Sequence, residues 1–370
     1  MEYLLYFTSL IISKLINSNK NKSNIGSILI VKLDHLGDVI TSLPSVYAIR
    51  RKFPEAEITS LVGEWVKDVL KNNPYIDNVI IYNSKRFEPK KHKYSLSKTV
   101  KLLSNIFEKR YDLIVGLRDD WLTLVFSLIY FPKVRIDRGT VRFRLKYKKF
   151  SDLFLRRTSS DKNIHEIDTN MMIAETGGID QIKEEKSIFL TDKERNWAED
   201  FLASLGLKGK RFVIISPGAK WKYRRWDVRK FANLADKIKK EFELEIVIAG
   251  SKDEIDTAEE MQKIMKGDSI SIAGKTNIRQ ILSLLERALL CITNDSGMVH
   301  LSSGLNVPIA AIFGPQDPEK FGPWSDNSIV FHKKVDCFPC SQKKCIQKNS
   351  PCVNLIDVND VFKKIRIYFL

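Results

Sequence analysis

A row of turn and helix-capping residues follows an apolar run near the end of the chain. Residues 294–297 (Asn-Asp-Ser-Gly) come after the strand-like residues 288–292, and residues 309–313 are again apolar, as in a strand covered on both faces. A helix that begins at Ser296-Gly297 would direct free N–H groups and partial positive charge toward the carboxyl edge of a sheet. The pattern predicts an anion site, and we expect a diphosphate there; a plain capped helix is the alternative. His300, one helical turn further on, either points at the same anion or is a core histidine.

Two other expected strand ends carry candidate chemical groups. Gly37-Asp38 follows the apolar residues 27–33 and begins a helix, so Asp38 is either a catalytic carboxylate or a helix cap. Residues 220–226 contain four cations, Lys220 and Arg224 among them, and three aromatic side chains. Such a loop could clamp phosphates and stack on a ring, whereas its alternative interpretation is a solvated loop.

The segments that would position these groups alternate between strand and helix. This alternation, in an α/β chain, is typical of a parallel, doubly wound sheet. It restarts after a linker near residues 182–193, which predicts two Rossmann-like domains facing a cleft, with ligands at the carboxyl ends of the strands. Residues 117–162 read as mostly irregular. We expect strands at 27–33, 58–62, 79–82, 112–116, 212–216, 245–249, 270–272, 288–292 and 309–313, and helices at 39–52, 66–72, 96–109, 168–177, 192–205, 226–242, 255–265, 278–286 and 357–370.

A chain of 370 residues is long enough for two domains. We expect an apolar N-terminal extension over 1–23, a first domain over 24–185, a second over 186–350, and a final helix over 351–370 that crosses back to the first domain. The apolar start is too short for a spanning helix, so it either lies in a membrane interface or packs on the protein surface. No secretory signal is evident, which indicates a cytoplasmic protein with reduced thiols.

Positive charge is concentrated in the first half of the chain. The net charge is +16, and residues 85–110 (+7) and 133–162 (+8) together carry almost all of it. A confined basic face implies a polyanionic partner: nucleic acid, anionic lipid or a phosphorylated substrate. The alternative is a solvated surface in a protein from a Lys-rich proteome, which explains the clustering poorly.

Four of the five cysteines lie in the basic tail. Cys337, Cys340, Cys345 and Cys352 form C-x2-C-x4-C-x6-C, which is close to the spacing of structural zinc sites but lacks a second C-x2-C pair. The sequence leaves a metal site, a disulfide and free thiols all open.

Three sequence blocks carry a resemblance to a known family. They are KLDHLGDVITSLPSVYAIRRKFPEAEIT, SPGAKWKYRRWDVRKFANLA and TNDSGMVHLSSGLNVPIAAIFGPQDPEKFGPW. In this order and at these separations they resemble the signature segments of glycosyltransferase family 9, the ADP-heptose:lipopolysaccharide heptosyltransferases. The resemblance extends from Ser27 to Trp324. It implies a GT-B fold, with the acceptor on the first domain and the nucleotide-sugar on the second.

The resemblance also implies roles for individual residues. It implies an inverting transfer without a metal or other cofactor, with Asp38 as general base. An acidic residue near the ribose would be Asp253 or Glu254, and the residues alone do not decide between them. The donor diphosphate would be held by Arg224, Asp295, Ser296, Gly297 and His300, and the cationic loop adds Lys220.

The family's acceptor is a phosphorylated lipid A–Kdo core, so the implied partners are ADP-heptose and an anionic glycolipid. The implied location is cytoplasmic, peripheral on the inner face of the inner membrane, and no nucleic acid is expected. Two positions depart from the common family pattern, since Met298 and Asp227 stand where many members have Pro. Other functions stay open: a cell-envelope glycosyltransferase with a non-heptose donor, an NAD-dependent dehydrogenase, for which the first strand lacks a G-x-G-x-x-G, or a non-enzymatic polyanion-binding protein.

Overall fold

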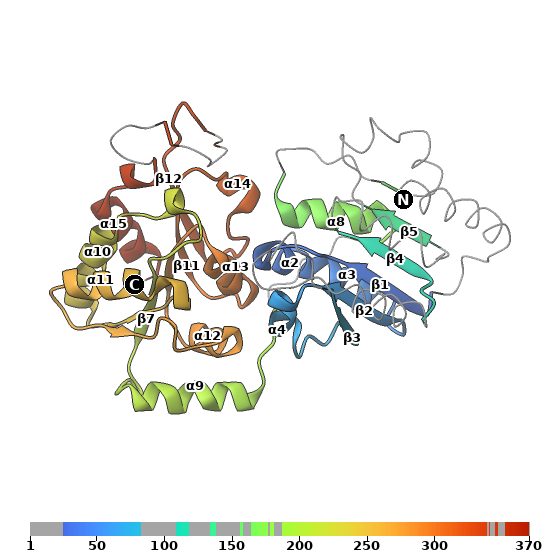
Figure 1. Ribbon diagram of the computed structural model, residues 1–370, viewed down its shortest axis with the longest axis horizontal. Coiled ribbons are helices and arrows are strands. Elements are labelled where there is room, and N and C mark those ends of the chain that lie inside the picture. Colours follow the sequence, from blue (N-terminus) through green and yellow to red (C-terminus); the bar gives the residue numbers. More distant parts are fainter. Residues whose placement is uncertain are drawn as a thin grey trace. The chain divides into compact units, whose positions relative to one another are not determined.

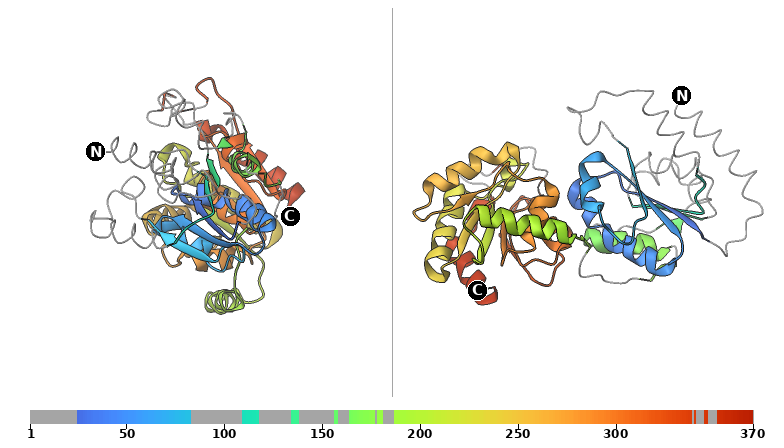
Figure 2. Two further views of the ribbon diagram at one scale, coloured as in Figure 1. Left: turned by 90° about the vertical axis from the view of Figure 1, so that its right-hand side faces the viewer. Right: turned by 90° about the horizontal axis from the view of Figure 1, so that it is seen from below.

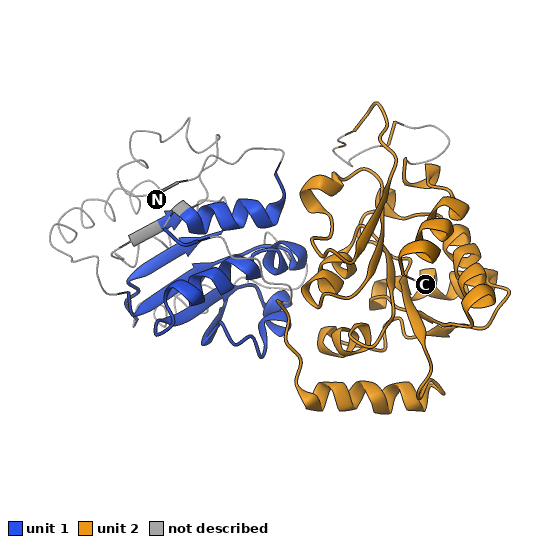
Figure 3. Ribbon diagram, turned by 180° about the vertical axis from the view of Figure 1, so that it is seen from behind, with its two compact units in different colours: residues 1–184 blue, residues 185–370 orange. Residues whose placement is uncertain are grey.

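The computed structural model describes residues 25–82, 109–117, 134–137, 156–157, 164–176, 178–180, 187–338, 340, 345–346 and 352–369. The chain divides into two compact units, residues 1–184 and 185–370 (Figure 3). The apolar extension, most of the two basic windows and nearly all of the helix expected at 96–109 lie outside the described residues. Within the described part, no helix combines the length and the hydrophobicity that crossing a bilayer requires.

The first unit is built on a six-stranded parallel sheet in the order β3-β2-β1-β4-β5-β6 (Figure 1). The apolar run SILIV forms its central strand, β1, which pairs with β2 on one side and β4 on the other. A strand covered on both faces requires such an unbroken run. The elements are β1 Ser27–Val31, α2 Leu36–Ile40, α3 Leu43–Lys52, β2 Glu57–Val62, η2 Glu64–Val66, α4 Lys67–Leu70, β3 Asn78–Ile81, β4 Leu113–Gly116, β5 Val134–Asp137, β6 Arg156–Arg157 and α8 Glu166–Thr176.

The single helix expected over 39–52 is wrong, because the chain forms α2 and α3 with a break between them. Pro44 lies in the first turn of α3 and has no N–H with which to continue the hydrogen bonds of α2. The Ser42 hydroxyl donates to the Val39 carbonyl at 2.7 Å, which helps to close the end of α2. The break leaves a short helix directly after β1, and this helix carries Asp38.

Two short strands, β5 and the edge strand β6, correct the expectation that residues 117–162 are irregular. β5 pairs in parallel with β4, and β6 pairs in parallel with β5. Both are short and lie in a strongly basic part of the sequence, so they lack the apolar run by which a buried strand is recognised.

The second unit repeats the topology of the first. Its parallel sheet has the order β12-β11-β10-β7-β8-β9, which is the 3-2-1-4-5-6 order of dinucleotide-binding sheets read from the other edge. Strands β7 and β11 have the predicted bounds, whereas β12 was not predicted. The elements are α9 Asp192–Ser204, β7 Phe212–Ser216, η3 Lys222–Arg224, α10 Val228–Phe242, β8 Glu245–Ile248, η4 Lys252–Glu254, α11 Ile255–Ile264, β9 Ile270–Ser271, α12 Ile278–Leu285, β10 Cys291–Asn294, α13 Gly297–Gly304, β11 Ile309–Phe313, α14 Pro318–Phe321, β12 Ser328–His332, η5 Cys352–Leu355 and α15 Val358–Tyr368.

The helix α9 is fixed to α12 by charge as well as by packing (Figures 1 and 2). Thr191 and Glu194 form a capping box at its start. The Arg279 guanidinium of α12 donates to the Glu194 carboxylate at 2.7 Å, and this hydrogen bond holds the pKa of Glu194 down to about 2. A second ion pair joins Arg195 to Glu286 at 2.8 Å. The first helix of the second unit is therefore fixed to that unit at two points.

The last helix, α15, packs on the second unit. Its buried residues Val361 and Ile365 belong to the core of that unit, and the expectation that it crosses back to the first domain stays a prediction. In that core Trp226 packs edge-on against Phe231, with ring centroids 5.0 Å apart, and its indole N–H donates to the carbonyl of Ile356 just before α15. These contacts bury the apolar face of α15 in the core of the second unit.

Candidate functional site

The strand order of the second sheet reverses between the parallel neighbours β7 and β10: β8 and β9 follow β7 toward one edge, and β11 and β12 follow β10 toward the other. Open parallel sheets bind ligands outside the carboxyl ends of the strands at such a switch point. The two motifs that begin at Pro217 and Asp295 follow β7 and β10 directly. The topology therefore brings together two loops that the sequence analysis had selected separately.

The turn after β10 has the geometry of a helix N-terminus. Ser296 is the N-cap of α13 in an extended conformation, and its Oγ accepts the N–H of Met298 at 3.3 Å. The expectation that a helix begins at Ser296-Gly297 is confirmed. Thr293 Oγ1 lies 3.2 Å from Ser296 Oγ and fixes the hydroxyl from the strand side. The free N–H groups of the first turn of α13 thus face the carboxyl edge of the sheet.

Arg224 and Asp295 form an ion pair across the switch point. The Arg224 Nη1 lies 3.1 Å from Asp295 Oδ2, and the Arg224 Nη2 donates to Gln316 Oε1 at 3.1 Å. Asp295 is 3 % exposed, and burial raises its pKa to about 6, although the nearby Arg224 charge acts in the opposite direction. The cation is therefore held in place by side chains that follow β10 and β11, with its own side chain still 20 % exposed. Gln316 was not predicted; the signal that could have revealed it is its place just after the end of a buried strand.

Asn294 is the buried link between the two loops. Its Nδ2 donates to the Pro217 carbonyl at 2.7 Å and lies 3.3 Å from the Gly218 carbonyl, while its Oδ1 accepts the backbone N–H of Trp226 at 2.9 Å. The side chain is fully buried, so each of these hydrogen bonds replaces water that cannot reach the site. Asn294 thus fixes both ends of the cationic loop against β10.

Of the two acidic candidates, the structure places Glu254 beside the switch point. Glu254 Oε2 accepts the N–H and the hydroxyl of Ser251 at 2.8 and 2.9 Å, which forms a capping box after β8. Glu254 Oε1 lies against Gly218, where a Cβ would approach it to 2.2 Å. Asp253 is exposed and makes no such contact among the described residues. Gly218 is therefore needed for the close approach of this carboxylate to the end of β7.

Two other predicted residues lie at the rim of this cluster. Lys220 is exposed in the loop after β7. His300 lies on α13, and its ring stacks on the indole of Trp324 with centroids 6.2 Å apart and an interplanar angle of 23°. The second unit therefore brings together Arg224, Asp295, Ser296, Gly297, Glu254 and, at its edge, Lys220 and His300.

In the first unit, Asp38 lies at the corresponding switch point. It is in the first turn of α2, directly after β1, and is partly exposed. The loop before it is anchored by the buried Lys32, whose Nζ donates to the Leu117 carbonyl at 2.7 Å and lies 3.6 Å from Asp34. The indole N–H of Trp65 donates to the Asp34 carbonyl at 2.9 Å. The Asp38 carboxylate thus stands on a short helix whose entry is fixed to two neighbouring strand ends. Lys32 was not predicted, because nothing in the sequence separates it from the other lysines.

Comparisons with known proteins identify the family of the chain. The model of "Glycosyltransferase family 9 (heptosyltransferase)" matches residues 99–350. The chain is 25 % identical to lipopolysaccharide heptosyltransferase 3 of Escherichia coli K12 over 309 residues, which cover 80 % of this chain and 84 % of that protein.

Solved structures give the same result. A glycosyltransferase family 9 structure from Veillonella parvula matches with a TM-score of 0.79 and 22 % identity, over 95 % of this chain and 99 % of that one. An Escherichia coli heptosyltransferase solved with ADP matches with a TM-score of 0.71 and 17 % identity, over 92 % and 99 %. The predicted GT-B fold class is confirmed.

Proposed function

Because the chain belongs to glycosyltransferase family 9, it is a glycosyltransferase, and we propose that it transfers heptose from ADP-heptose to a lipopolysaccharide core or related glycolipid, with inversion and without a metal. The observation that carries this proposal is the cluster at the β7/β10 switch point. A cation, a helix N-terminus and a carboxylate stand there together, as a nucleoside diphosphate requires.

The donor diphosphate would be held by Arg224 and the first amides of α13. In the transfer step the bond from the anomeric carbon to the diphosphate breaks, and negative charge grows on the departing oxygen. Hydrogen-bond donors stabilise this charge best when they are held in the correct orientation before the reaction begins. Asp295 and Gln316 hold the Arg224 guanidinium in this way. These groups supply the charge stabilisation that a divalent ion supplies in other transferases. The Escherichia coli neighbour solved with ADP supports an adenine nucleotide as donor.

Glu254 would meet the ribose of the donor. Its Oε2 is engaged by Ser251, which fixes the carboxylate plane, and its Oε1 lies at the end of β7 next to Gly218. A carboxylate oriented in this way can accept hydrogen bonds from the ribose hydroxyls, as acidic residues do in other doubly wound sheets.

Asp38 would act as the general base. Inversion requires the acceptor hydroxyl to attack the anomeric carbon from the side opposite the diphosphate, and a carboxylate beside that hydroxyl removes its proton as the new bond forms. The proposal therefore requires Asp38 and the bound donor to meet on one sugar.

The acceptor would be an anionic glycolipid at the cytoplasmic face of the inner membrane. The sequence windows 85–110 and 133–162, which lie largely outside the described residues, carry net charges of +7 and +8. Since each cation near an anionic membrane surface contributes roughly 1 kcal/mol, a few of them suffice for peripheral binding.

The test is sugar transfer with a panel of nucleotide-sugars, for the wild type and Asp38→Asn. We expect Asp38→Asn to lower kcat by about 10²- to 10⁴-fold, which is the usual contribution of a general base. Calorimetry should show unchanged ADP affinity, because Asp38 does not hold the donor.

Asp68→Asn is the matched control, since Asp68 also lies in the first turn of a short helix of the same unit. Near-normal turnover of Asp38→Asn would show that Asp38 is not the general base. Failure of every nucleotide-sugar in the panel to bind the wild type would remove the donor site, and preference for another sugar nucleotide would replace heptose while leaving the site intact.

A further inference from the structure

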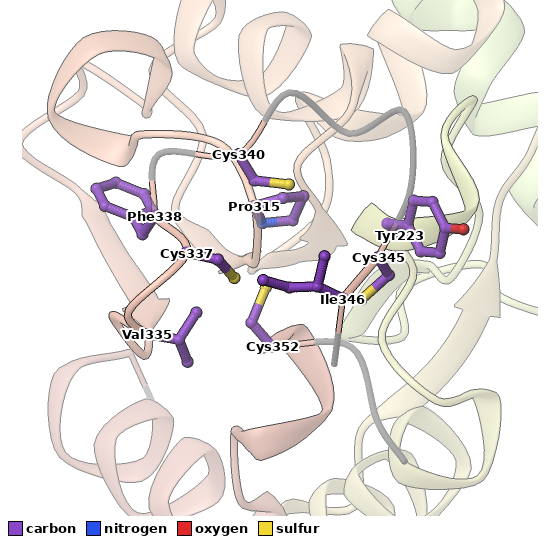
Figure 4. Close-up of a pocket in the computed structure, with 9 residues that line it drawn as sticks. All are labelled: Tyr223, Pro315, Val335, Cys337, Phe338, Cys340, Cys345, Ile346 and Cys352. Atoms are coloured by element: carbon purple, nitrogen blue, oxygen red, sulfur yellow. The ribbon is translucent and has the colours of Figure 1, made fainter. Parts of the chain in front are cut away.

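The four cysteines of the tail surround one small pocket. Cys337, Cys340, Cys345 and Cys352, here called the tail cysteines, line it together with apolar side chains and Tyr223 (Figure 4). No disulfide joins any two of these four described cysteines. The cavity volume is about 20 Å³, which is room for about one water-sized particle. Four cysteine side chains thus line a cavity that is large enough for a single ion.

The composition of the pocket wall favours a soft cation over water. Apart from the tail cysteines, the lining residues are Tyr223, Pro315, Val335, Phe338 and Ile346. A buried water needs several polar partners, and four thiols in an apolar wall are poor ones. Four cysteine sulfurs are instead the ligand set of closed zinc sites and of iron–sulfur proteins.

A cross-link would stabilise the tail between β12 and η5. Its described residues form no helix or strand, and Ile346 is 70 % exposed, so little apolar burial holds them. Two points of the chain near the pocket are anchored: the Cys340 N–H donates to the Pro315 carbonyl at 3.4 Å, and Val353 packs against Gly314, where a Cβ would approach to 2.7 Å. A metal ion would join the middle of the tail to these anchored points.

We propose that the tail cysteines form a structural four-thiolate site for one zinc or iron ion. As the side chains stand, no three His, Cys, Asp or Glu residues of the described chain are close enough to hold a metal. The site therefore requires rotation of cysteine side chains, each of which has a single torsion with three staggered positions. Binding converts the thiols to thiolates and releases their protons.

The location gives the site a defined structural role. Pro315 directly precedes Gln316, and Tyr223 directly precedes Arg224, so the pocket touches both loops that hold the cation of the switch point. A closed metal site has no open coordination position for substrate. The ion would fix the tail against these two loops without taking part in the sugar transfer.

The first experiment measures metal in the full-length chain, purified without a polyhistidine tag from medium that contains both zinc and iron. Elemental analysis should give about one zinc or iron per chain, and the ratio of the two identifies the metal. The double variant Cys337→Ser/Cys352→Ser should lose this metal by about tenfold or more. Cys291→Ser is the control, because Cys291 lies in β10, away from the pocket, and should keep the metal. Wild-type protein with no more metal than the double variant would overturn the proposal.

A second measurement keeps the test decisive if the double variant does not fold. Wild-type protein stripped by a chelator is titrated with Co²⁺, and a tetrahedral thiolate site should give sulfur-to-cobalt charge transfer and strong visible bands at one equivalent. Mass spectrometry of unreduced, alkylated peptides should find all four tail cysteines alkylated after the metal is removed. A disulfide among them, or a cobalt spectrum without thiolate bands, would contradict the site. None of these readouts depends on turnover, so they stand apart from the proposed transferase activity.

Discussion

The Arg224 guanidinium lies 3.1 Å from the Asp295 carboxylate, although 71 positions separate the two residues in the chain. The pair joins the loop after β7 to the turn after β10, where the strand order of the sheet reverses. The Asp295 side chain is almost completely buried, whereas that of Arg224 is 20 % exposed. The exposed part of the guanidinium is therefore accessible to a ligand phosphate.

Replacement of Arg224 by Ala should weaken ADP binding by about 10- to 100-fold, which corresponds to the loss of a charge-assisted hydrogen bond. Isothermal calorimetry with ADP is the measurement. Arg229→Ala is the matched control, because Arg229 is 76 % exposed, pairs with Asp227 and lies outside the cluster. Equal ADP affinities for the two variants would show that Arg224 does not hold the diphosphate.

Asp295 should make stability depend on pH in the acidic range. Its pKa is about 6 in the folded chain and 3.8 in the reference state, so the folded state binds the proton more tightly. The resulting stabilisation is present below pH 4 and is lost as the pH rises through 6. The loss is about 3 kcal/mol at 1.36 kcal/mol per pKa unit. Relative to the wild type, Asp295→Asn should thus gain about this much free energy of unfolding between pH 4 and pH 7, measured by urea denaturation. Parallel curves for the two proteins would rule out the raised pKa.

Removal of Asn294 should loosen the site without removing a proposed ligand contact. Asn294→Ala leaves the Trp226 N–H and the Pro217 carbonyl buried without their partner, at a cost of about 1–3 kcal/mol in the free energy of unfolding. ADP affinity should also fall, since the cationic loop is no longer fixed to β10. Asn327→Ala, at an exposed position, should leave both quantities unchanged. Wild-type stability of Asn294→Ala would show that water replaces the lost partner.

The sequence predicted strands best where burial on both faces demands an unbroken apolar run. Strands β7 and β11 are such runs, and their bounds were predicted to the residue. β12 was missed because it lies at the edge of the sheet and most of its side chains are only half-buried, so its hydrophobic signal is weak. The break between α2 and α3 was missed because Pro44 was placed inside one helix, although proline in a first turn marks a new helix.

The site residues that the sequence could not supply are those whose role depends on topology. Gln316 and Asn294 acquire partners only when β11, β10 and β7 become neighbours. The position of Glu254, in a capping box and against Gly218, likewise depends on the neighbouring strand ends and could not be predicted from the sequence. Local motifs thus identified the loops, while the strand order determined which side chains meet.

The contact between Gly218 and Glu254 allows the position of the Glu254 carboxylate and its charge to be changed separately. In Gly218→Ala, the new Cβ would stand 2.2 Å from Glu254 Oε1, so the flexible carboxylate must move out of its capping box. The loss of a helix cap costs about 1 kcal/mol in the free energy of unfolding. ADP affinity should fall by about tenfold, as it should in Glu254→Gln, because both changes remove an oriented carboxylate from the ribose.

Two control variants test whether the loss of ADP affinity is specific to Gly218 and Glu254. In Gly26→Ala the Cβ makes only ordinary contact at 3.7 Å with Asp112, and Asp253→Asn changes the exposed neighbour of Glu254. Both should bind ADP as the wild type does. The double variant Gly218→Ala/Glu254→Gln should bind no more weakly than either single variant, because two changes that remove one interaction are not additive. Additive losses of ADP affinity in the double variant would mean that Gly218 contacts the donor directly. An unchanged ADP affinity in Glu254→Gln would show that the Glu254 carboxylate does not bind the ribose.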